Sequence, residues 1–210
     1  MDQYKELARQ LAQVFEKECL PLCQLDAQAG DGDHGVTISR GFAGAWAQVE
    51  KLPDDAGADE VTRTIGYGML EEMGGASGPI FSTLFIQMAI VLKDRPLDSA
   101  ATLQEVLDQS LAAISDLTGT QPGEKTMLDA IAGAAEGVRQ SGAVTLEEAL
   151  AAAEAGAQRG AEATVDMVAT KGRAKFMGER SRGFMDAGSR SCALIFEIMH
   201  RVLGKEAGYA

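Results

Sequence analysis

Residues 25–35 concentrate groups that could bind a cation. They include three carboxylates, Asp26, Asp31 and Asp33, together with glycines and one imidazole, His34. Carboxylates held close together repel one another and raise one another's pKa, so a fold that keeps them ionised in one place normally needs a cation there. Steps of five and seven residues do not place these side chains on one face of a helix, but a glycine-containing loop could fold back and bring them together.

The chemistry of the loop favours magnesium. Carboxylate oxygens suit Mg²⁺ or Ca²⁺, but the twelfth residue counted from Asp26 or Asp31 is Thr37 or Phe42, and the calcium EF-hand requires a glutamate there. Mg²⁺ usually takes one or two carboxylates and shares its other positions with water and phosphates, so the loop suits one or two Mg²⁺ ions that bridge a nucleotide. An Asx-rich turn that caps the following helix explains the same residues, and the loop alone leaves both interpretations open.

Two further segments could bind an anion. The glycine-rich turn of residues 74–79 leads into a predicted helix, whose first N–H groups and positive dipole end could hold a phosphate, although close helix packing would require the same glycines. Residues 171–187 form a long connection that is either an anion clamp or a solvated loop with scattered charges. This connection holds five of the 19 basic residues, namely Lys171, Arg173, Lys175, Arg180 and Arg182.

The two histidines occupy opposite kinds of position. His34 lies beside the aspartates at the start of a predicted helix, where it could donate a hydrogen bond to a phosphate oxygen. His200 lies near the carboxyl end of the last predicted helix, where the dipole favours an imidazolium, and we interpret it as structural. With only two histidines an all-histidine zinc site is excluded.

The overall composition narrows the class of partner. The formal net charge of −12 argues against nucleic acid or an anionic membrane surface as the main partner. No run of about eighteen apolar residues occurs, and the amino terminus lacks a signal-peptide core, so we expect a cytoplasmic protein. We expect Cys19, Cys23 and Cys192 to be reduced and mostly buried, with Pro21 interrupting any helical face shared by the first two.

The spacing of apolar residues predicts an all-α fold. They recur every three or four residues and alternating β-branched runs are nearly absent, so we expect one helical domain over residues 1–210. Pro79 suits the first position of a helix, and the segment Thr145–Glu148 resembles a capping box. The expected helices span residues 2–24, 35–51, 58–73, 79–92, 102–117, 124–140, 145–170 and 188–203.

Taken in order, the motifs resemble one family, the L subunit of dihydroxyacetone kinase, which is equivalent to the nucleotide-binding domain of the single-chain kinases. The motifs are LDAQAGDGDHG, GGASGP, PGEKTMLD, KGRAKFMGERS and MDAGSRS, and they extend from Asp26 to Ser191. The resemblance implies a barrel of amphipathic antiparallel helices whose loops at one end hold ADP or ATP and two Mg²⁺ ions. It also implies a short ketose acceptor held covalently by a histidine of a separate, sugar-binding K subunit.

The resemblance also implies roles for individual residues. Asp26, Asp31 and Asp33 would bind the metals, and residues 34–37 and 76–77 would lie against the phosphates. Thr37 stands where we expect the family's asparagine, and Asp186-Ala187-Gly188 replaces its usual Asp-Pro-Gly, which loosens the last loop. The residues implied to contact the nucleotide are His34, Gly35, Val36, Thr37, Ala76, Ser77, Gly119, Met127, Arg173, Asp186, Ala187 and Gly188.

The expected mechanism asks for positioning and charge neutralisation rather than for a general base, and none is conspicuous in the sequence. We therefore expect negligible sugar phosphorylation by this chain without its partner. In one alternative, ADP stays bound as a cofactor and is rephosphorylated by a phosphohistidine protein, the M subunit of a phosphotransferase-system form. A magnesium-dependent phosphohydrolase and a nucleotide-loaded regulatory adaptor are two others.

Overall fold

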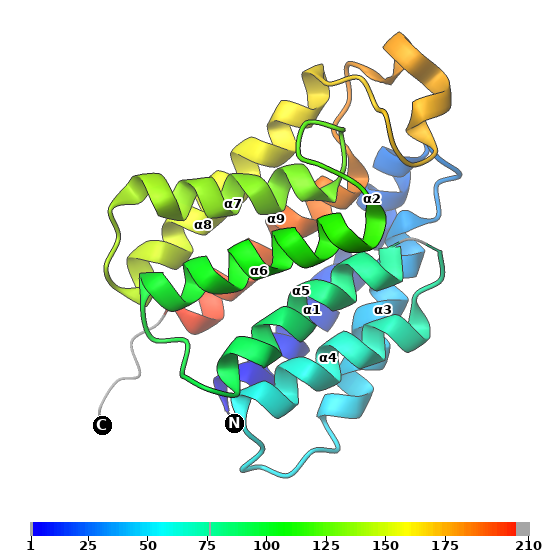
Figure 1. Ribbon diagram of the computed structural model, residues 1–210. Helices are drawn as coiled ribbons and strands as arrows, with labels where there is room; N and C mark the ends of the chain where they lie inside the picture. The colour runs from blue at the N-terminus through cyan, green and yellow to red at the C-terminus, as the bar shows by residue number, and fades with distance from the viewer. Residues whose placement is uncertain (1, 76, 205–210) are drawn as a thin grey trace.

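The computed structural model describes residues 2–75 and 77–204, and this part of the chain is helical and has no β-strand (Figure 1). The predicted all-α class is confirmed. None of the described helices has the length and apolar character needed to cross a membrane. The α-helices are α1 (Gln3–Lys17), α2 (Cys19–Asp26), α3 (His34–Val49), α4 (Ala58–Glu72), α5 (Ser77–Leu92), α6 (Ala100–Thr118), α7 (Met127–Ser141), α8 (Leu146–Ala163) and α9 (Ala187–Leu203), with the 3-10 segments η1 (Thr164–Asp166) and η2 (Ala174–Ser181) before α9.

From α2 to α9 the helices run in alternating directions, so every second connection lies at the same end of the bundle (Figure 1). We call this end, at the upper right of Figure 1, the loop end. It holds the connections from α2 to α3, from α4 to α5, from α6 to α7 and from α8 through η1 and η2 to α9. Four α-helices therefore begin at the loop end, where their free N–H groups and positive dipole ends are gathered.

Aromatic rings join α1, α3 and α5 in the core. The rings of Phe15 and Phe42 stack with centroids 4.6 Å apart, and Phe85 meets Phe42 edge-on at 5.9 Å. All three side chains are fully buried. Aromatic pairs of this kind contribute about 0.5–1.5 kcal/mol beyond the area that they bury. These contacts hold α3, whose first residues belong to the predicted site, against its neighbours.

Glycines allow α7 and α8 to pack with their backbones close together. A Cβ atom at Gly133 would lie 2.3 Å from the carbonyl oxygen of Gly156, and one at Gly156 would lie 2.1 Å from that of Gly133. Gly160 meets the backbone of Asp129 in the same way, with 2.2 Å between its ideal Cβ position and the carbonyl oxygen. Only residues without a Cβ atom permit this separation. The contact fixes the start of α7 against the end of α8, both at the loop end.

The structure corrects several predicted boundaries. The helix expected over residues 2–24 breaks at Glu18 into α1 and α2. The helix expected from Glu124 begins at Met127, and the helix expected to reach residue 170 ends at Ala163. The other predicted helices are confirmed with small shifts at their ends. The predicted capping box at the start of α8 is confirmed by its reciprocal hydrogen bonds.

Two prolines occupy helix positions that differ from the prediction. Pro79 is the third residue of α5 and not the first, and Pro21 is the third residue of α2, which runs through both Cys19 and Cys23. The first N–H groups of a helix lack an intrahelical partner, so proline at these positions removes no hydrogen bond. The predicted interruption at Pro21 was therefore wrong. All three cysteines are free, but Cys192 is buried and the other two are half-buried.

Candidate functional site

The connection between α2 and α3 folds back over the end of α2 and gathers the three aspartates. The backbone oxygen of Asp26 accepts a hydrogen bond from the N–H of Gly30 at 2.6 Å, and its Oδ2 accepts one from the N–H of Gly32 at 2.9 Å. Gly32 has a φ of 75°, a conformation that favours glycine. As a result, Asp26, Asp31 and Asp33 each offer a carboxylate oxygen within 4.8 Å of the others.

The loop was interpreted either as a metal site or as a turn that caps the following helix, and different residues fit each interpretation. Asp33 is the N-cap residue of α3, but its side chain makes no capping hydrogen bond. Only Asp26 ties down a backbone N–H, that of Gly32. The carboxylate of Asp31 instead contacts the guanidinium of Arg173, whose Nη1 also lies 3.7 Å from Oδ1 of Asp33. A cation from a distant segment thus lies against the aspartates, as their mutual repulsion requires.

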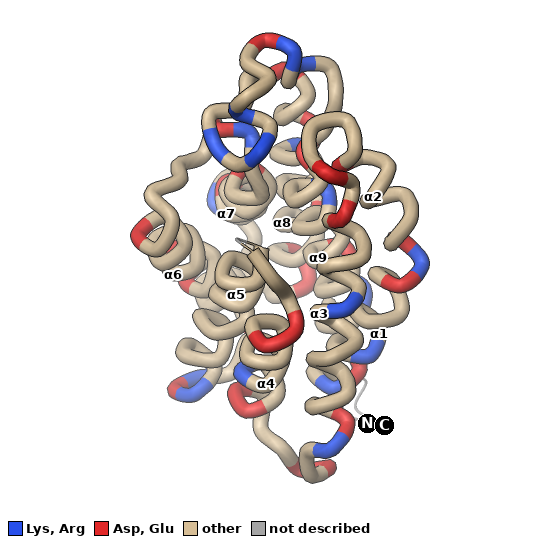
Figure 2. The backbone as a smooth tube through the Cα atoms, turned by 90° about the vertical axis from the view of Figure 1, so that its right-hand side faces the viewer, with Lys and Arg blue, Asp and Glu red and all other residues tan. Residues whose placement is uncertain are grey.

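Acidic and basic segments meet at the loop end, as the coloured tube in Figure 2 shows near the labels α2 and α7. Of the predicted anion clamp, Arg173 reaches the aspartates, whereas Lys171 donates a hydrogen bond to the carbonyl of Gly119 at 2.9 Å. Lys175 lies over the ring of Phe176, and Arg182 pairs with Glu179. Most of the five basic side chains therefore contact protein groups, and Arg173 joins the clamp to the aspartates.

His34 is buried at the first turn of α3. Its Nε2 lies 2.8 Å from the hydroxyl oxygen of Ser191 on α9, and its ring centroid lies 6.2 Å from that of Phe81 on α5. Burial lowers the pKa of His34, and the charge of Asp26 only partly opposes this effect. The imidazole is therefore neutral at pH 7, and α3, α5 and α9 converge on it at the loop end.

The other residues implied to lie beside the phosphates also occupy helix starts. Gly35 is buried against the backbone of α2, Val36 is 55% exposed, and Thr37 is half-buried. Ser77 is the first residue of α5, while Ala76 lies outside the described residues. The structure therefore places Gly35, Val36, Thr37 and Ser77 at the starts of two helices that converge at His34.

A second group of predicted residues comes from the connections around α7 and α9. Gly119 ends α6 with a φ of 64°, and Met127 is the first residue of α7. A Cβ atom added at Gly188 would lie 3.0 Å from Cε of Met127, so the starts of α7 and α9 are in contact. Ala187 and Gly188 are buried in the first turn of α9.

Asp186 caps α9. Its Oδ2 accepts a hydrogen bond from the N–H of Ser189 at 2.7 Å. Burial raises the pKa of Asp186 to about 6, although that hydrogen bond and the nearby charge of Lys125 favour its ionised form. A carboxyl with a pKa near neutrality at the loop end is a feature of functional sites as well as of buried caps.

Sequence reasoning missed the residues that organise the start of α7. Thr126 accepts a hydrogen bond from the N–H of Leu128, and the Asp129 carboxylate accepts one from the N–H of Thr126 at 2.7 Å, which makes a capping box. The spacing of Thr126 and Asp129 was a usable signal for this helix start. Lys125, which is buried beside them, carries no comparable local signal.

A family model described as the DAK2 domain matches residues 28–201. The chain belongs to the DAK2 family. Its fold also matches the crystal structure of the dihydroxyacetone kinase of C. freundii in the native form, with a TM-score of 0.69 and 25% sequence identity. That match covers 94% of this chain and 34% of the C. freundii chain, so the described DAK2 fold corresponds to about a third of that enzyme.

Three relatives of the DAK2 chain match it over most of their length. It is 35% identical over 190 residues to the PEP-dependent dihydroxyacetone kinase, ADP-binding subunit DhaL, of Escherichia coli, covering 89% of each chain. It is 36% identical over 181 residues to the PEP-dependent dihydroxyacetone kinase 1, ADP-binding subunit DhaL, of Listeria innocua, covering 85% of this chain and 84% of that protein. The PTS-dependent ADP-binding subunit DhaL of Lactococcus lactis is 30% identical over 182 residues, covering 87% of each chain.

The side chains at the loop end of this DAK2 chain fit a divalent cation with an anionic ligand. Three carboxylates supply only oxygen donors, which is the set that Mg²⁺ prefers, and two of them are exposed to solvent. The nearby helix starts and Arg173 supply positive potential for an anion. The same end can therefore hold a metal ion and a phosphate together.

Proposed function

We propose that this chain is the ADP-binding subunit of a kinase for dihydroxyacetone or a related short ketose. The convergence of Asp26, Asp31 and Asp33, with their carboxylate oxygens within 4.8 Å of one another, carries the proposal. This convergence occurs in a DAK2 chain at the end where α3, α5, α7 and α9 begin. Relatives that the chain matches over 84–89% of their length are named ADP-binding subunits of dihydroxyacetone kinase.

The three aspartates would hold two Mg²⁺ ions, which when bound neutralise the charge on the phosphates and on the group in transfer. The first turns of α3 and α5 supply N–H donors for the phosphate oxygens. Because Nε2 of His34 faces Ser191, its Nδ1 is the ring nitrogen left to interact with a phosphate. Arg173 lies beside Asp31, from where its guanidinium can pair with a phosphate oxygen in a charge-assisted hydrogen bond.

The proposed donor is a phosphoprotein of the sugar phosphotransferase system, and ADP stays on the chain as a cofactor that is phosphorylated and used in turn. Support comes from the names of the relatives, which are PEP-dependent or PTS-dependent. In this scheme an M-type phosphohistidine subunit phosphorylates the bound ADP, and a K subunit presents the ketose. The chain would act in the cytoplasm, and it would not phosphorylate a ketose without the K subunit.

Reconstitution tests this scheme. The chain is mixed with a K subunit and dihydroxyacetone, and sugar phosphate is measured either with ATP or with phosphoenolpyruvate and the phosphotransferase proteins. Many turnovers with phosphoenolpyruvate and few with ATP are expected. Sustained turnover with ATP alone would favour a donor that exchanges freely, and release of inorganic phosphate without a K subunit would favour a phosphohydrolase instead.

Mass spectrometry of the native protein tests the cofactor directly. Chain purified without added nucleotide should carry ADP, because a bound cofactor that is recycled on the protein does not need to dissociate. The same sample with Asp31→Asn should carry less ADP, since the variant loses one of the charges that would hold the metal. Wild-type protein free of nucleotide and unable to bind added ADP with Mg²⁺ would refute the proposed function.

A further inference from the structure

Lys125 occupies an unusual position in the connection between α6 and α7. It is the one residue other than glycine with a positive φ, 60°, in the part of the chain that the structure describes. The residue is only 3% exposed. A left-handed backbone is unfavourable for a residue with a side chain, and burial of an ammonium group is unfavourable unless it is paired. The surrounding contacts must therefore compensate for both.

The ammonium group of Lys125 joins three segments of the chain. Its Nζ donates hydrogen bonds to the carbonyl oxygen of Thr164, just after α8, and to that of Phe184, just before α9, the latter at 2.6 Å. It also lies 4.9 Å from the centroid of the Phe184 ring, within the range of a cation–π contact. The turn before α7 is thus linked through one side chain to the end of α8 and to the start of α9.

Three carboxylates near this ammonium group favour its charged form. Burial lowers the pKa of Lys125, and the charges of Asp186, Asp129 and Asp166 oppose this effect. Of these, Asp129 belongs to the capping box of α7 and Asp186 is the N-cap of α9. Lys125 therefore lies between the acidic caps of α7 and α9, two helices whose first residues are predicted to contact the nucleotide.

The segments that Lys125 joins are those that carry the second group of predicted nucleotide residues. Gly119 and Met127 flank its own turn, and Asp186 follows Phe184 by two residues. Further bonds tie the same segments together, since the N–H of Asp186 donates to Oγ1 of Thr164 at 2.9 Å. The side chain of Lys125 reaches the centre of this arrangement, and its hydrogen bonds and cation–π contact are made there rather than with residues 34–37 or 77.

We propose that Lys125 is a positioning residue for the nucleoside part of ADP, because it holds the turn before α7, the end of α8 and the start of α9 in their relative places. This inference rests on the proposed function. The resemblance assigns the phosphates to residues 34–37 and 76–77, which leaves the nucleoside to the segments that Lys125 joins, where other residues implied to contact the nucleotide lie. Loss of the ammonium group should therefore weaken the binding of ADP much more than that of pyrophosphate.

The test compares the dissociation constants of ADP and of inorganic pyrophosphate, each measured with Mg²⁺ by calorimetry. Lys125→Met should raise the dissociation constant of ADP by about tenfold or more, because hydrogen bonds from a charged donor are lost. The dissociation constant of pyrophosphate should stay within about twofold of the wild-type value, the range of a substitution away from a contact. Lys125→Arg keeps the charge and the donors, so it should recover part of the affinity for ADP, although the larger guanidinium must fit the same buried space beside Phe184.

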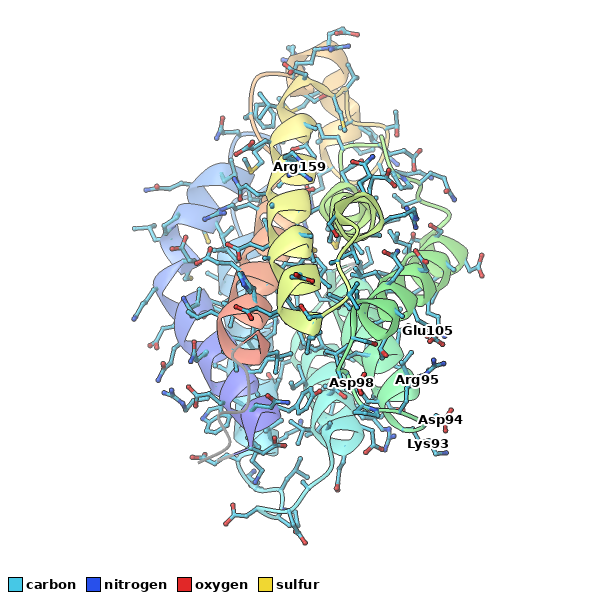
Figure 3. The ribbon with its side chains drawn as sticks, turned by 90° about the vertical axis from the view of Figure 1, so that its left-hand side faces the viewer. Lys93, Asp94, Arg95, Asp98, Glu105 and Arg159 are labelled. Atoms are coloured by element: carbon cyan, nitrogen blue, oxygen red, sulfur yellow. The ribbon has the colours of Figure 1, made fainter. Side chains whose placement is uncertain are left out.

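Lys93→Met is the matched control. Lys93 is an exposed residue just after α5, at the end of the bundle opposite η2 (Figure 3). The same change of side chain there should leave both dissociation constants at the wild-type values. If Lys125→Met does not fold, Lys125→Gln, which keeps a neutral donor, is compared with Lys125→Arg in the same two titrations.

The outcomes separate the inference from the proposed function. If the variants of Lys125 melt at lower temperature but bind ADP as the wild type does, or if ADP and pyrophosphate weaken by the same factor, the positioning role is refuted. If the wild-type chain binds neither ligand with Mg²⁺, the proposed function falls and this inference falls with it. A selective loss of ADP affinity in Lys125→Met that Lys125→Arg partly restores supports the role.

Discussion

Gly35→Ala should disturb the connection between α2 and α3, which carries Asp31 and Asp33, through a steric clash rather than through a lost contact with a ligand. A Cβ atom at this position would lie 1.9 Å from the carbonyl oxygen of Cys19 and 2.9 Å from the backbone nitrogen of Cys23. Both atoms belong to the backbone of α2, so no side chain can rotate away. Ordinary contact begins near 3.4 Å, so α2 and α3 must separate by about 1.5 Å.

The magnitude follows from this separation. Overpacking of this kind costs about 1–3 kcal/mol, and a chain of this size loses about 2–4 °C in Tm for each kcal/mol, so a fall of roughly 6 °C is expected. Asp26 is the last residue of α2 and would move with it, away from Asp31 and Asp33. Metal sites tolerate changes of only about 0.2 Å in ligand distance, so stabilisation by ADP with Mg²⁺ should be lost as well.

Differential scanning fluorimetry with and without ADP and Mg²⁺ measures both effects. Gly74→Ala is the control for the Tm without ligand, because a Cβ atom at Gly74 meets nothing within 4 Å and its φ is not positive. The control should change the free energy of unfolding by no more than about 0.5 kcal/mol. If Gly35→Ala keeps the Tm of the wild type, the steric argument is refuted. Loss of ADP binding without a fall in Tm would then assign Gly35 to ligand contact alone.

Three further predictions concern the ligand, the metal residues and pH. For chain first freed of nucleotide, ADP with Mg²⁺ at a hundredfold excess over Kd should stabilise the fold by about 2.7 kcal/mol, which raises Tm by about 5–11 °C. EDTA should abolish the rise, and an equal rise in EDTA would contradict a metal-bridged nucleotide. Asp31→Asn and Asp33→Asn should each remove most of the rise in Tm that ADP with Mg²⁺ produces. The far-ultraviolet circular dichroism should be unchanged, because neither carboxylate caps a helix. Unfolding of either variant would favour a structural role. Asp186→Asn should change how stability depends on pH, because burial raises the pKa of Asp186 in the folded state to about 6 from 3.8. The stability that protonation of Asp186 contributes is fully present below the unfolded pKa and is lost as pH rises through about 6. The free energy of unfolding of the wild type should therefore fall by up to about 3 kcal/mol relative to that of Asp186→Asn between about pH 4 and pH 7. Urea unfolding measured across this range would contradict the prediction if the two proteins showed the same dependence on pH.

The sequence was sufficient for features that depend on neighbouring residues. Apolar residues at helical spacing predicted an all-α fold, and Thr145 and Glu148 marked the start of α8 correctly. The ordered motifs predicted the family, which the DAK2 match to residues 28–201 confirms. Periodicity failed at Glu18, where α1 ends, because the buried Leu22 of α2 continues the apolar spacing of α1 past the break.

In the candidate site too, local sequence predicted the residue types, and the fold decided which residues meet. Repulsion among Asp26, Asp31 and Asp33 predicted that a cation must lie near them, but only the fold brings Arg173 to Asp31. The roles of the metal and nucleotide residues stay predictions. The structure adds to them the contact between His34 and Ser191, which joins α3 to α9.

The sequence by itself therefore determined the helices, their approximate ends and the residue types that suit a metal and a phosphate, since these depend on propensity, periodicity and charge within a few residues. Tertiary structure alone decided which of these residues meet. Lys125 stands in a polar turn that looks exposed in the sequence, yet its side chain is buried between Thr164 and Phe184. The partners that make this burial favourable lie far along the chain, and only the packing of α7, α8 and α9 brings them to it.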